Sequence, residues 1–297
     1  MKKVLLLLLI VSLAVTAGCG STNTQAPAPK DSSIKIGGSS TLAPTIANCA
    51  NDFTEKYQTW KKVNAQLPDE QIVIFVASGG SGLGVNSAIN GTVDIGLVSR
   101  EIKDSEKAKL PNHKFYTLGY DALTIAVNPK NPVLQVKPNL TAEEVKKIFS
   151  GELKTWQQLD ASLPNRPIVV AVRDLGGGAT QAFDEAIMKG TPITKEAIQL
   201  PSMGALAGKV QENVDAIGYV SVGFVQADKA KFGVLSVNGI APTSENIAAG
   251  KYQIARPLII ITKDKPDDKQ QNFIEYLLSE NGYKAIEAMG FVPVRVK

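Results

Sequence analysis

The sequence has few of the residues on which most metal sites and hydrolases depend. Its 297 residues include 2 cysteines and 1 histidine, and aromatic residues make up 6%. The cysteines, Cys19 and Cys49, have no spacing typical of a metal motif. The histidine, His113, lies in a polar stretch. Ser81 does not fit the Gly-x-Ser-x-Gly pattern of a nucleophilic hydrolase, because Leu83 stands where the pattern has its last glycine. The composition therefore argues against a metalloenzyme and against a Ser-His-Asp hydrolase.

Signatures of nucleotide and nucleic-acid binding are also missing. No Gly-x-x-x-x-Gly-Lys-Ser/Thr run occurs, and residues 80–85 depart from the dinucleotide fingerprint at its last glycine. The formal net charge is +4, and no basic run carries interleaved aromatic residues. So small an excess does not favour nucleic acid. We expect no cofactor, no metal and no nucleic-acid partner.

The beginning of the chain has the pattern of an export signal. Basic residues precede an apolar run over 4–15, which is short for a membrane span. Thr16-Ala17-Gly18-Cys19 then resembles a bacterial lipobox, although Thr16 stands where leucine is usual. We expect residues 1–18 to be a signal peptide and Cys19 to become a lipidated first residue. The alternative is an ordinary cleaved signal that leaves Cys19 as a thiol.

The next stretch, 19–33, is rich in Ser, Thr, Gln, Ala and Pro and shows no apolar periodicity. Such composition is typical of a flexible tether, here between the anchor and the folded part. Cys49 lies in a helical pattern and is interpreted as a buried small apolar residue. A disulfide between Cys19 and Cys49 is the alternative, which lipidation of Cys19 would exclude.

Three loops of small residues follow predicted strands and precede predicted helices. They are 37–41 after strand 34–36, 77–84 after strand 72–76, and 176–180 after strand 168–173. Free backbone N–H groups and the helix dipole attract anions at such helix starts. With Arg173 beside the third loop, the pattern predicts one small oxyanion held by three helix starts. The alternative for each loop is a tight turn without a ligand.

The alternation of strands and helices predicts an α/β protein with a doubly wound sheet. Two long apolar strands, 122–127 and 257–262, are interpreted as crossings between two lobes. We expect lobe 1 to comprise 34–120 and 258–297, and lobe 2 to comprise 121–257. A further helix is expected near 194–199. Two crossings form a hinge, and the third loop lies on the other lobe from the first two, so closure would bury the anion.

Several motifs resemble those of the phosphate-binding proteins of bacterial phosphate ABC transporters, and the resemblance spans nearly all of 34–297. They are Gly38-Ser39-Ser40-Thr41-Leu42-Ala43-Pro44, Ser78-Gly79-Gly80-Ser81-Gly82, Val93 to Arg100, Ile217 to Ser221, Ile148 to Gly151 with Trp156, and Gly290 to Val294. The resemblance implies a two-lobed type II periplasmic-binding-protein fold, with two mixed sheets joined by two hinge strands. It also implies capture of inorganic phosphate, without chemistry, by a monomer outside the cytoplasm. The implied partners are the membrane permease and ATPase subunits of an ABC importer.

Carried over residue by residue, the resemblance gives Thr41, Ser81 and Thr180 hydroxyl and N–H donors to phosphate. It also gives a backbone N–H to Leu42. The third loop departs from the family pattern because it lacks a serine hydroxyl, and the N–H groups of Gly178 and Ala179 are expected to compensate. The expected phosphate-binding residues are Ser40, Thr41, Leu42, Ser81, Gly82, Arg100, Asp121, Arg173, Gly178, Ala179 and Thr180.

A second departure concerns selectivity. Some family members carry an aspartate where this chain has Arg100, and that aspartate accepts the proton of phosphate. We hypothesise that Asp121 replaces this acceptor and so rejects sulfate; the alternative is that Asp121 only braces the hinge. Arg100 and Arg173 would supply charge-assisted donors. The other functions left open are binding of another oxyanion such as sulfate, a sensor or adhesin, and a secreted phosphatase or esterase using Ser81 or Thr41.

Overall fold

The computed structural model of the chain describes residues 33–295. The expected signal peptide, the lipidated Cys19 and all of the tether but its last residue lie outside the described residues. Between 33 and 295, no helix is long and apolar enough to cross a membrane.

The first half of the fold is a mixed sheet in the order β2-β1-β3-β10-β4. β1 is parallel to β2 and β3, whereas β10 is antiparallel to both β3 and β4. The strands are β1 (Ile34–Ser39), β2 (Ile74–Gly79), β3 (Ile95–Val98), β4 (His113–Val127), β10 (Ala255–Lys263) and β11 (Val292–Pro293), which pairs with β4. The helices are α1 (Ala43–Tyr57), α2 (Trp60–Val63), α3 (Ser81–Ile89), α4 (Asp104–Lys107), α12 (Asp268–Leu277) and α13 (Glu280–Ala288).

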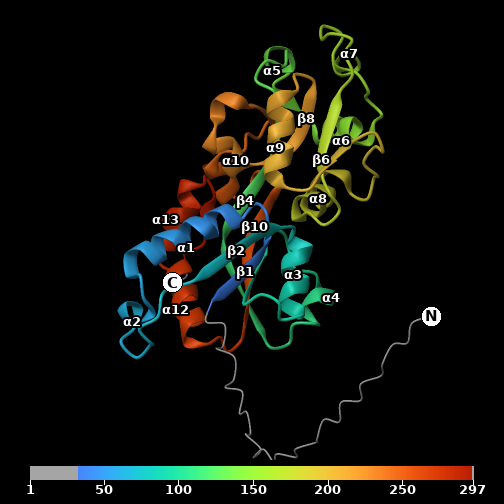
Figure 1. The fold of residues 1–297 in the computed structure, drawn as a ribbon. Helices are drawn as coiled ribbons and strands as arrows, with labels where there is room; N and C mark the ends of the chain where they lie inside the picture. The colour runs from blue at the N-terminus through green and yellow to red at the C-terminus, as the bar shows by residue number, and fades with distance from the viewer. Residues whose placement is uncertain (1–32, 296–297) are drawn as a thin grey trace, which may run out of the picture. The chain divides into compact units, whose positions relative to one another are not determined.

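The second half continues from β4 through β8, β6 and β7, and Figure 1 labels β8 and β6 in it. β9 pairs with β4, and β5 pairs with β9. β6 is parallel to β7 and β8, and β4 is antiparallel to β8 and β9. The strands are β5 (Asn139–Leu140), β6 (Val169–Arg173), β7 (Ile198–Leu200), β8 (Ala216–Ser221) and β9 (Gly233–Val237). The helices are α5 (Val133–Val136), α6 (Ala142–Ser150), α7 (Trp156–Leu159), α8 (Gly178–Phe183), η1 (Asp184–Met188), α9 (Met203–Glu212), α10 (Val222–Ala227), η2 (Lys229–Lys231) and α11 (Ser244–Ala248).

One strand, β4, belongs to both sheets. Its residues 113–122 pair with β10, and its residues 123–127 pair with β8. The predicted two-lobed α/β fold is confirmed, and β4 is one of the two strands expected to cross between the lobes. The other expected crossing strand, 257–262, is part of β10, which among the described residues pairs with β3 and β4 and so lies within the first sheet.

Two aromatic clusters fill the cores beside the two sheets. Beside the first, Phe53 of α1 packs on Trp60, Phe273 and Tyr276. Beside the second, the ring centroids of Phe149, Phe183 and Tyr219 lie within 5.8 Å of one another, and Tyr219 stacks on both phenylalanines. Burying each such ring contributes on the order of 2–3 kcal/mol to folding. These clusters fix the positions of α1, α6, α8 and β8, which carry or flank the loops described below.

Two local predictions have different outcomes. Cys49 is a buried free cysteine, as predicted, and burial raises its pKa to about 12. The helix expected near 194–199 is wrong, because 198–200 form the short strand β7, which pairs in parallel with β6.

Candidate functional site

The first loop lies between β1 and α1 and is organised by the hydroxyl of Ser39. Its Oγ accepts the backbone N–H groups of Thr41 at 3.2 Å and Leu42 at 3.3 Å, and lies 2.6 Å from Ser99 Oγ. Since Ser39 already accepts two hydrogen bonds, its own hydrogen points to Ser99. The N–H groups that begin α1 are therefore gathered at one point, through long bonds that a stronger acceptor could replace.

The second loop ends at Ser81, which begins α3. Ser81 is buried, and its Oγ accepts the backbone N–H of Ser99 at 3.0 Å. Gly84 in the same helix packs so closely on the carbonyl of Leu97 that a Cβ there would overlap it. Glycine at 84 thus lets the start of α3 approach β3, and the hydroxyl hydrogen of Ser81 is left available as a donor.

In the third loop, Thr180 makes hydrogen bonds to other residues of the same loop. Thr180 Oγ1 lies 3.0 Å from the carbonyl of Arg173 and 2.8 Å from that of Asp174, and its N–H donates to Gly177 O at 3.1 Å. Thr180 Oγ1 also lies 3.1 Å from Tyr219 Oη. The donors of Thr180 that were expected to reach phosphate are engaged within the loop in this structure.

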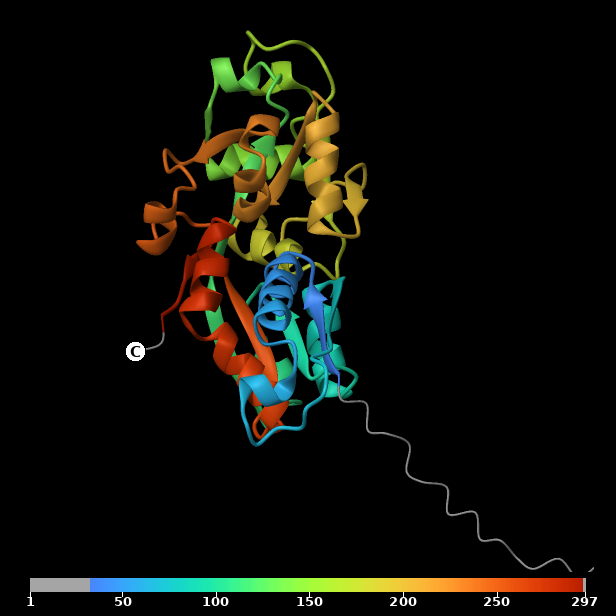
Figure 2. The same ribbon diagram turned by 60° about the vertical axis from the view of Figure 1, so that its left-hand side comes forward.

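The structure brings the three loops together. A Cβ at Gly178 would overlap Ser81 Oγ and lie 2.8 Å from Ser99 O, so α8 begins directly against α3. Gly82 N–H donates across the same contact to Gly176 O at 3.4 Å. The ribbon views place α8 where the two halves meet (Figures 1 and 2). The predicted convergence of loops from both halves is therefore present.

Arg173 joins the first loop to the second half. Its Nη1 donates to Ser40 Oγ at 2.9 Å, while Nε donates to Leu200 O at 3.1 Å. Nη2 donates to Asp174 Oδ1 at 3.1 Å and to Pro201 O at 3.0 Å. Burial lowers the pKa of Arg173, opposed by the neighbouring charge of Asp174. The side chain is 3% exposed, so a positive charge is held beside the loops with little access to water.

A further arginine, Arg256, lies where the three loops meet and was not predicted from the sequence. It stands opposite Asp121 in the β10–β4 ladder, and its Nε and Nη2 donate to Asp121 Oδ2 at 2.9 and 2.7 Å. Nη2 also donates to Thr41 Oγ1 at 2.9 Å, and Nη1 donates to Ser99 O at 3.1 Å. The sequence signal was a lone charge at the end of a buried apolar strand, which is easily taken for an exposed strand end.

Asp121 is in the cluster, but its carboxylate is occupied. It accepts two hydrogen bonds from Arg256 at Oδ2 and one from Ser221 Oγ at 2.8 Å at Oδ1. Complete burial raises the pKa of Asp121, and the charge and hydrogen bonds of Arg256 oppose that rise. The expected role as acceptor of a phosphate proton differs from this arrangement, because two bonds from Arg256 and one from Ser221 already take most of the about four lone-pair positions of the carboxylate.

The side chain of Arg100 does not contact the three loops where they meet. Its Nη1 and Nη2 donate to the two carboxylate oxygens of Glu106, both at 2.7 Å, and Nη1 donates to Glu101 O at 2.8 Å. Burial opposes ionisation of Glu106, but the bonds from Arg100 and from the Lys103 N–H outweigh it, so the pKa of Glu106 is lowered. The guanidinium is thus directed at α4, away from the loops.

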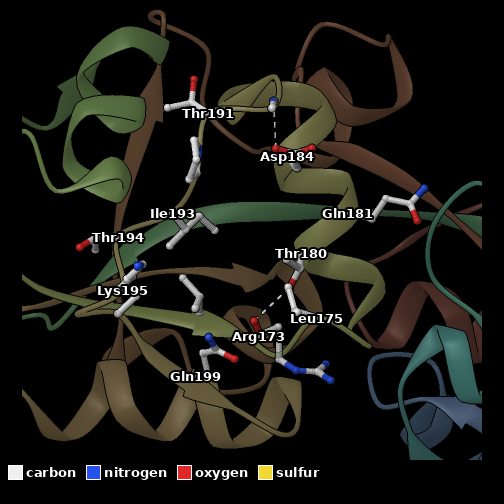
Figure 3. Close-up of a pocket in the computed structure, with 14 residues that line it drawn as sticks. Arg173, Leu175, Thr180, Gln181, Asp184, Thr191, Ile193, Thr194, Lys195 and Gln199 are labelled. Atoms are coloured by element: carbon white, nitrogen blue, oxygen red, sulfur yellow. Dashed lines mark hydrogen bonds between the residues drawn. The ribbon is translucent and has the colours of Figure 1, made fainter.

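A cavity of about 510 Å³ lies beside the third loop (Figure 3). Arg173 and Thr180 line one wall, and the segment from Gly190 to Gln199 lines another. Figure 3 shows the guanidinium of Arg173 extending away from this cavity toward the first half. All the lining residues belong to the second half, so the cavity is separate from the meeting point of the loops.

Residues 33–295 hold no group of three His, Cys, Asp or Glu side chains placed to bind a metal ion. His113 begins β4, at the end of the strand remote from Asp121. Burial, together with the nearby charge of Lys263, lowers the pKa of His113. Neither observation supplies a base beside Ser81 or Thr41.

The comparisons with known proteins agree with this geometry. The model of the PBP superfamily domain matches residues 23–281. The phosphate-binding protein PstS of Staphylococcus saprophyticus is 30% identical over 94% of this chain and 86% of its own length. The chain belongs to the PstS family. The PstS of Bacillus subtilis is 29% identical over 99% of this chain and 94% of its own length.

Solved structures extend the PstS likeness to the fold. A phosphate ABC transporter substrate-binding protein from Clostridium perfringens, with bound phosphate, gives a TM-score of 0.76 at 27% identity. The match covers 88% of this chain and 99% of that one. An ABC-type phosphate transport receptor from Vibrio cholerae gives 0.68 at 27% identity, with 88% and 100% covered. The two-lobed fold of the PstS family is therefore the fold of this chain.

Proposed function

We propose that the chain captures inorganic phosphate outside the cytoplasm and delivers it to the permease and ATPase subunits of an ABC importer. The observation that carries this proposal is the meeting of three donor-rich loops from both halves around buried positive charge. Arg173 and Arg256 are 3% and 2% exposed, and Asp121 is the buried acid beside them. The buried excess is positive, and an oxyanion neutralises it. As a member of the PstS family, the chain is a solute-binding protein and not an enzyme.

The hydroxyl groups of the loops are oriented as donors. Ser40 Oγ accepts from Arg173 Nη1 and from the N–H of Met203 at 3.1 Å. Thr41 Oγ1 accepts from Arg256, and Ser81 Oγ accepts from Ser99 N–H. A hydroxyl whose oxygen already accepts an N–H turns its hydrogen elsewhere, and here the available direction is the anion. The N–H groups of Thr41, Leu42, Ser81, Gly178 and Ala179 complete the proposed set, together with that of Gly82 once it leaves its long bond to Gly176 O, with Thr180 holding the third loop in place.

We propose a hinge between lobe 1, expected over residues 34–120 and 258–297, and lobe 2, expected over residues 121–257. Because β10 lies in the first sheet from Ala255 onward, Arg256 is counted with the first half. β4 runs from one sheet to the other without a break, which supports a bend at that strand. Opening the hinge would separate Ser40 from Arg173 and Ser81 from Gly178, and phosphate would favour the closed form by bridging them.

Binding is tested by calorimetry and thermal unfolding with phosphate, sulfate and other oxyanions, in a buffer free of both anions. A ligand that binds only the folded chain stabilises it by about 2.7 kcal/mol at 100 times its Kd. We expect phosphate to raise the Tm and to titrate to one site per monomer. A rise with sulfate and none with phosphate would instead support the other oxyanion function that the same donors could serve.

We also propose that Cys19 is lipidated and holds the protein on the membrane as a monomer. The support is the sequence pattern of 1–19, which resembles an export signal followed by a lipobox. Replacing Cys19 with serine should move the protein from the membrane to the soluble fraction of the producing cells. Retention of the Cys19→Ser protein on the membrane would contradict the anchor.

A further inference from the structure

We propose that Arg256 contacts the bound anion as a principal counter-charge, and that Asp121 acts through Arg256 as a positioning residue. In this arrangement Asp121 does not accept the proton of phosphate. The inference rests on the proposed function, because it assigns roles within the same site.

The donor count of Arg256 leaves one hydrogen for a ligand. A guanidinium has five N–H donors. Nε and Nη2 each donate one hydrogen bond to Asp121. The second hydrogen of Nη2 is donated to Thr41, and one hydrogen of Nη1 is donated to the carbonyl of Ser99. The remaining hydrogen is on Nη1. Among the described residues, no hydrogen bond uses it.

The position of Nη1 places that hydrogen where the loops meet. Nη1 lies 3.1 Å from Ser99 O, and the same carbonyl lies 2.8 Å from where a Cβ of Gly178 would be. Ser99 N–H in turn holds Ser81 Oγ. The available N–H of Arg256 is therefore adjacent to the starts of both α3 and α8. Because the side chain is 2% exposed, its charge is little screened by water.

Arg256 and Arg173 approach the site from opposite halves. Arg256 comes from β10 in the first sheet, and Arg173 ends β6 in the second. Arg173 is partly neutralised by Asp174, which is 43% exposed at the edge of the site. Arg173 also leaves one Nη1 hydrogen without a partner among residues 33–295. An anion between the two Nη1 groups would be bound by both halves.

Asp121 fits a positioning role better than direct recognition. Of its about four acceptor positions, two receive Arg256 and one receives Ser221. Ser221 ends β8 in the second sheet, so the carboxylate ties Arg256 to the strand crossing. The fixed guanidinium then donates to Thr41 Oγ1, and the hydroxyl hydrogen of Thr41 is left pointing to the anion. Asp121 thus sets the geometry of two donors without needing a contact of its own.

The test compares Arg256→Gln, Arg256→Lys and Asp121→Asn with the wild type, using phosphate and sulfate as probes in calorimetry. We expect Arg256→Gln to weaken phosphate binding about 100-fold, since it removes a charge-assisted bond and the charge itself. Arg256→Lys should weaken it about 10-fold, because one ammonium keeps the charge but cannot reach Asp121, Thr41 and Ser99 together. Arg295→Gln, which alters an exposed arginine paired with Glu280 and Glu287, is the matched control and should bind like the wild type.

The ratio of the two affinities separates the two roles of Asp121. If Asp121 acts through Arg256, Asp121→Asn weakens phosphate and sulfate by the same factor and leaves their ratio unchanged. If Asp121 accepts a phosphate proton, the ratio moves at least about 10-fold toward sulfate, and the positioning role is overturned.

A measurement on the unmodified protein guards against variants that fail to fold. The Nε resonance of Arg256, assigned by its loss in Arg256→Lys or by selective labelling, should shift when phosphate is added to the wild type. The inference would be overturned if the wild type bound phosphate without that shift, or if folded Arg256→Gln bound phosphate with full affinity. In either case the proposed function would remain intact. Failure of the wild type to bind phosphate at all would overturn the proposed function itself.

Discussion

At the scale of single residues, the site depends on side chains that accept one hydrogen bond in order to donate another. Ser40, Thr41 and Ser81 each accept an N–H from elsewhere in the fold. All three could be predicted from the sequence because serine, threonine and glycine gather in short loops after strands. Arg256 could not, because nothing local distinguishes it from a solvent-exposed arginine. Its role is created by Asp121, far away in the sequence and directly opposite in the β10–β4 ladder.

For Arg100 the opposite holds. Its motif helped to indicate the family, but its side chain binds Glu106 and not the site where it was expected. The bidentate bond to Glu106 could not be predicted from the motif, since it depends on the backbone bringing α4 back beneath Ser99-Arg100. Its side chain is 6% exposed and that of Glu106 is 21% exposed. A buried arginine without an anionic partner is costly, so Glu106 should matter for stability.

We predict that Glu106→Gln lowers the free energy of unfolding by about 1–3 kcal/mol at neutral pH. The pKa of Glu106 is lowered in the folded state, so its contribution is present above its unfolded pKa and is lost as pH falls through the folded value. The difference between the variant and the wild type should therefore shrink below about pH 4. Urea unfolding at several pH values measures it. Glu143→Gln, at an exposed pair with Lys146, is the control; a Glu106→Gln difference that persists in acid would contradict the role of the pair.

At the scale of elements, strand and helix starts were predicted better than pairing. The sequence predicts an apolar strand over 122–127, where the structure has the longer strand β4 (His113–Val127). Between residues 122 and 123, β4 changes its pairing partner from β10 in the first sheet to β8 in the second, and no local sequence pattern indicates this change. Near 194–199, local preference suggested a helix, but pairing with β6 makes 198–200 a strand. Long-range pairing therefore overrode local propensity in both places.

Close contact between α8 and α3 leads to a prediction for Gly178. We expect Gly178→Ala to weaken phosphate binding at least about 10-fold, because the added methyl group meets Ser81 and Ser99 only when the loops close. Gly208→Ala in α9 is the matched control, since a Cβ there has no neighbour within 4 Å. That control should bind normally and gain up to about 1 kcal/mol in stability. Calorimetry and thermal unfolding of both variants decide the matter; equal phosphate affinity in Gly178→Ala and the wild type would contradict a closed contact at this point.

At the scale of the whole molecule, two halves are joined by a continuous strand and also by direct contacts between loops. The alternation of elements was enough to predict the two sheets, and the placement of small-residue loops was enough to predict that they meet. The direct contacts between the halves could not be predicted. Ser40 is the clearest of these, because both N–H groups that it accepts, from Arg173 and Met203, belong to the second half.

Ser40 therefore links closure to affinity. In the closed form, Ser40→Ala leaves one N–H of Arg173 and the backbone N–H of Met203 without their acceptor, whereas in an open form water can reach both. The substitution should thus shift the equilibrium toward the open form and weaken phosphate binding about 10-fold. Small-angle scattering should show a larger radius of gyration for Ser40→Ala than for the wild type at subsaturating phosphate, and equal radii at saturation. Ser87→Ala in α3 serves as the control, because its hydroxyl is outside the loop cluster. If Ser40→Ala bound more weakly while its scattering matched the wild type throughout, Ser40 would act only as a direct donor to phosphate, and closure would have to depend on the Ser81–Gly178 contact instead.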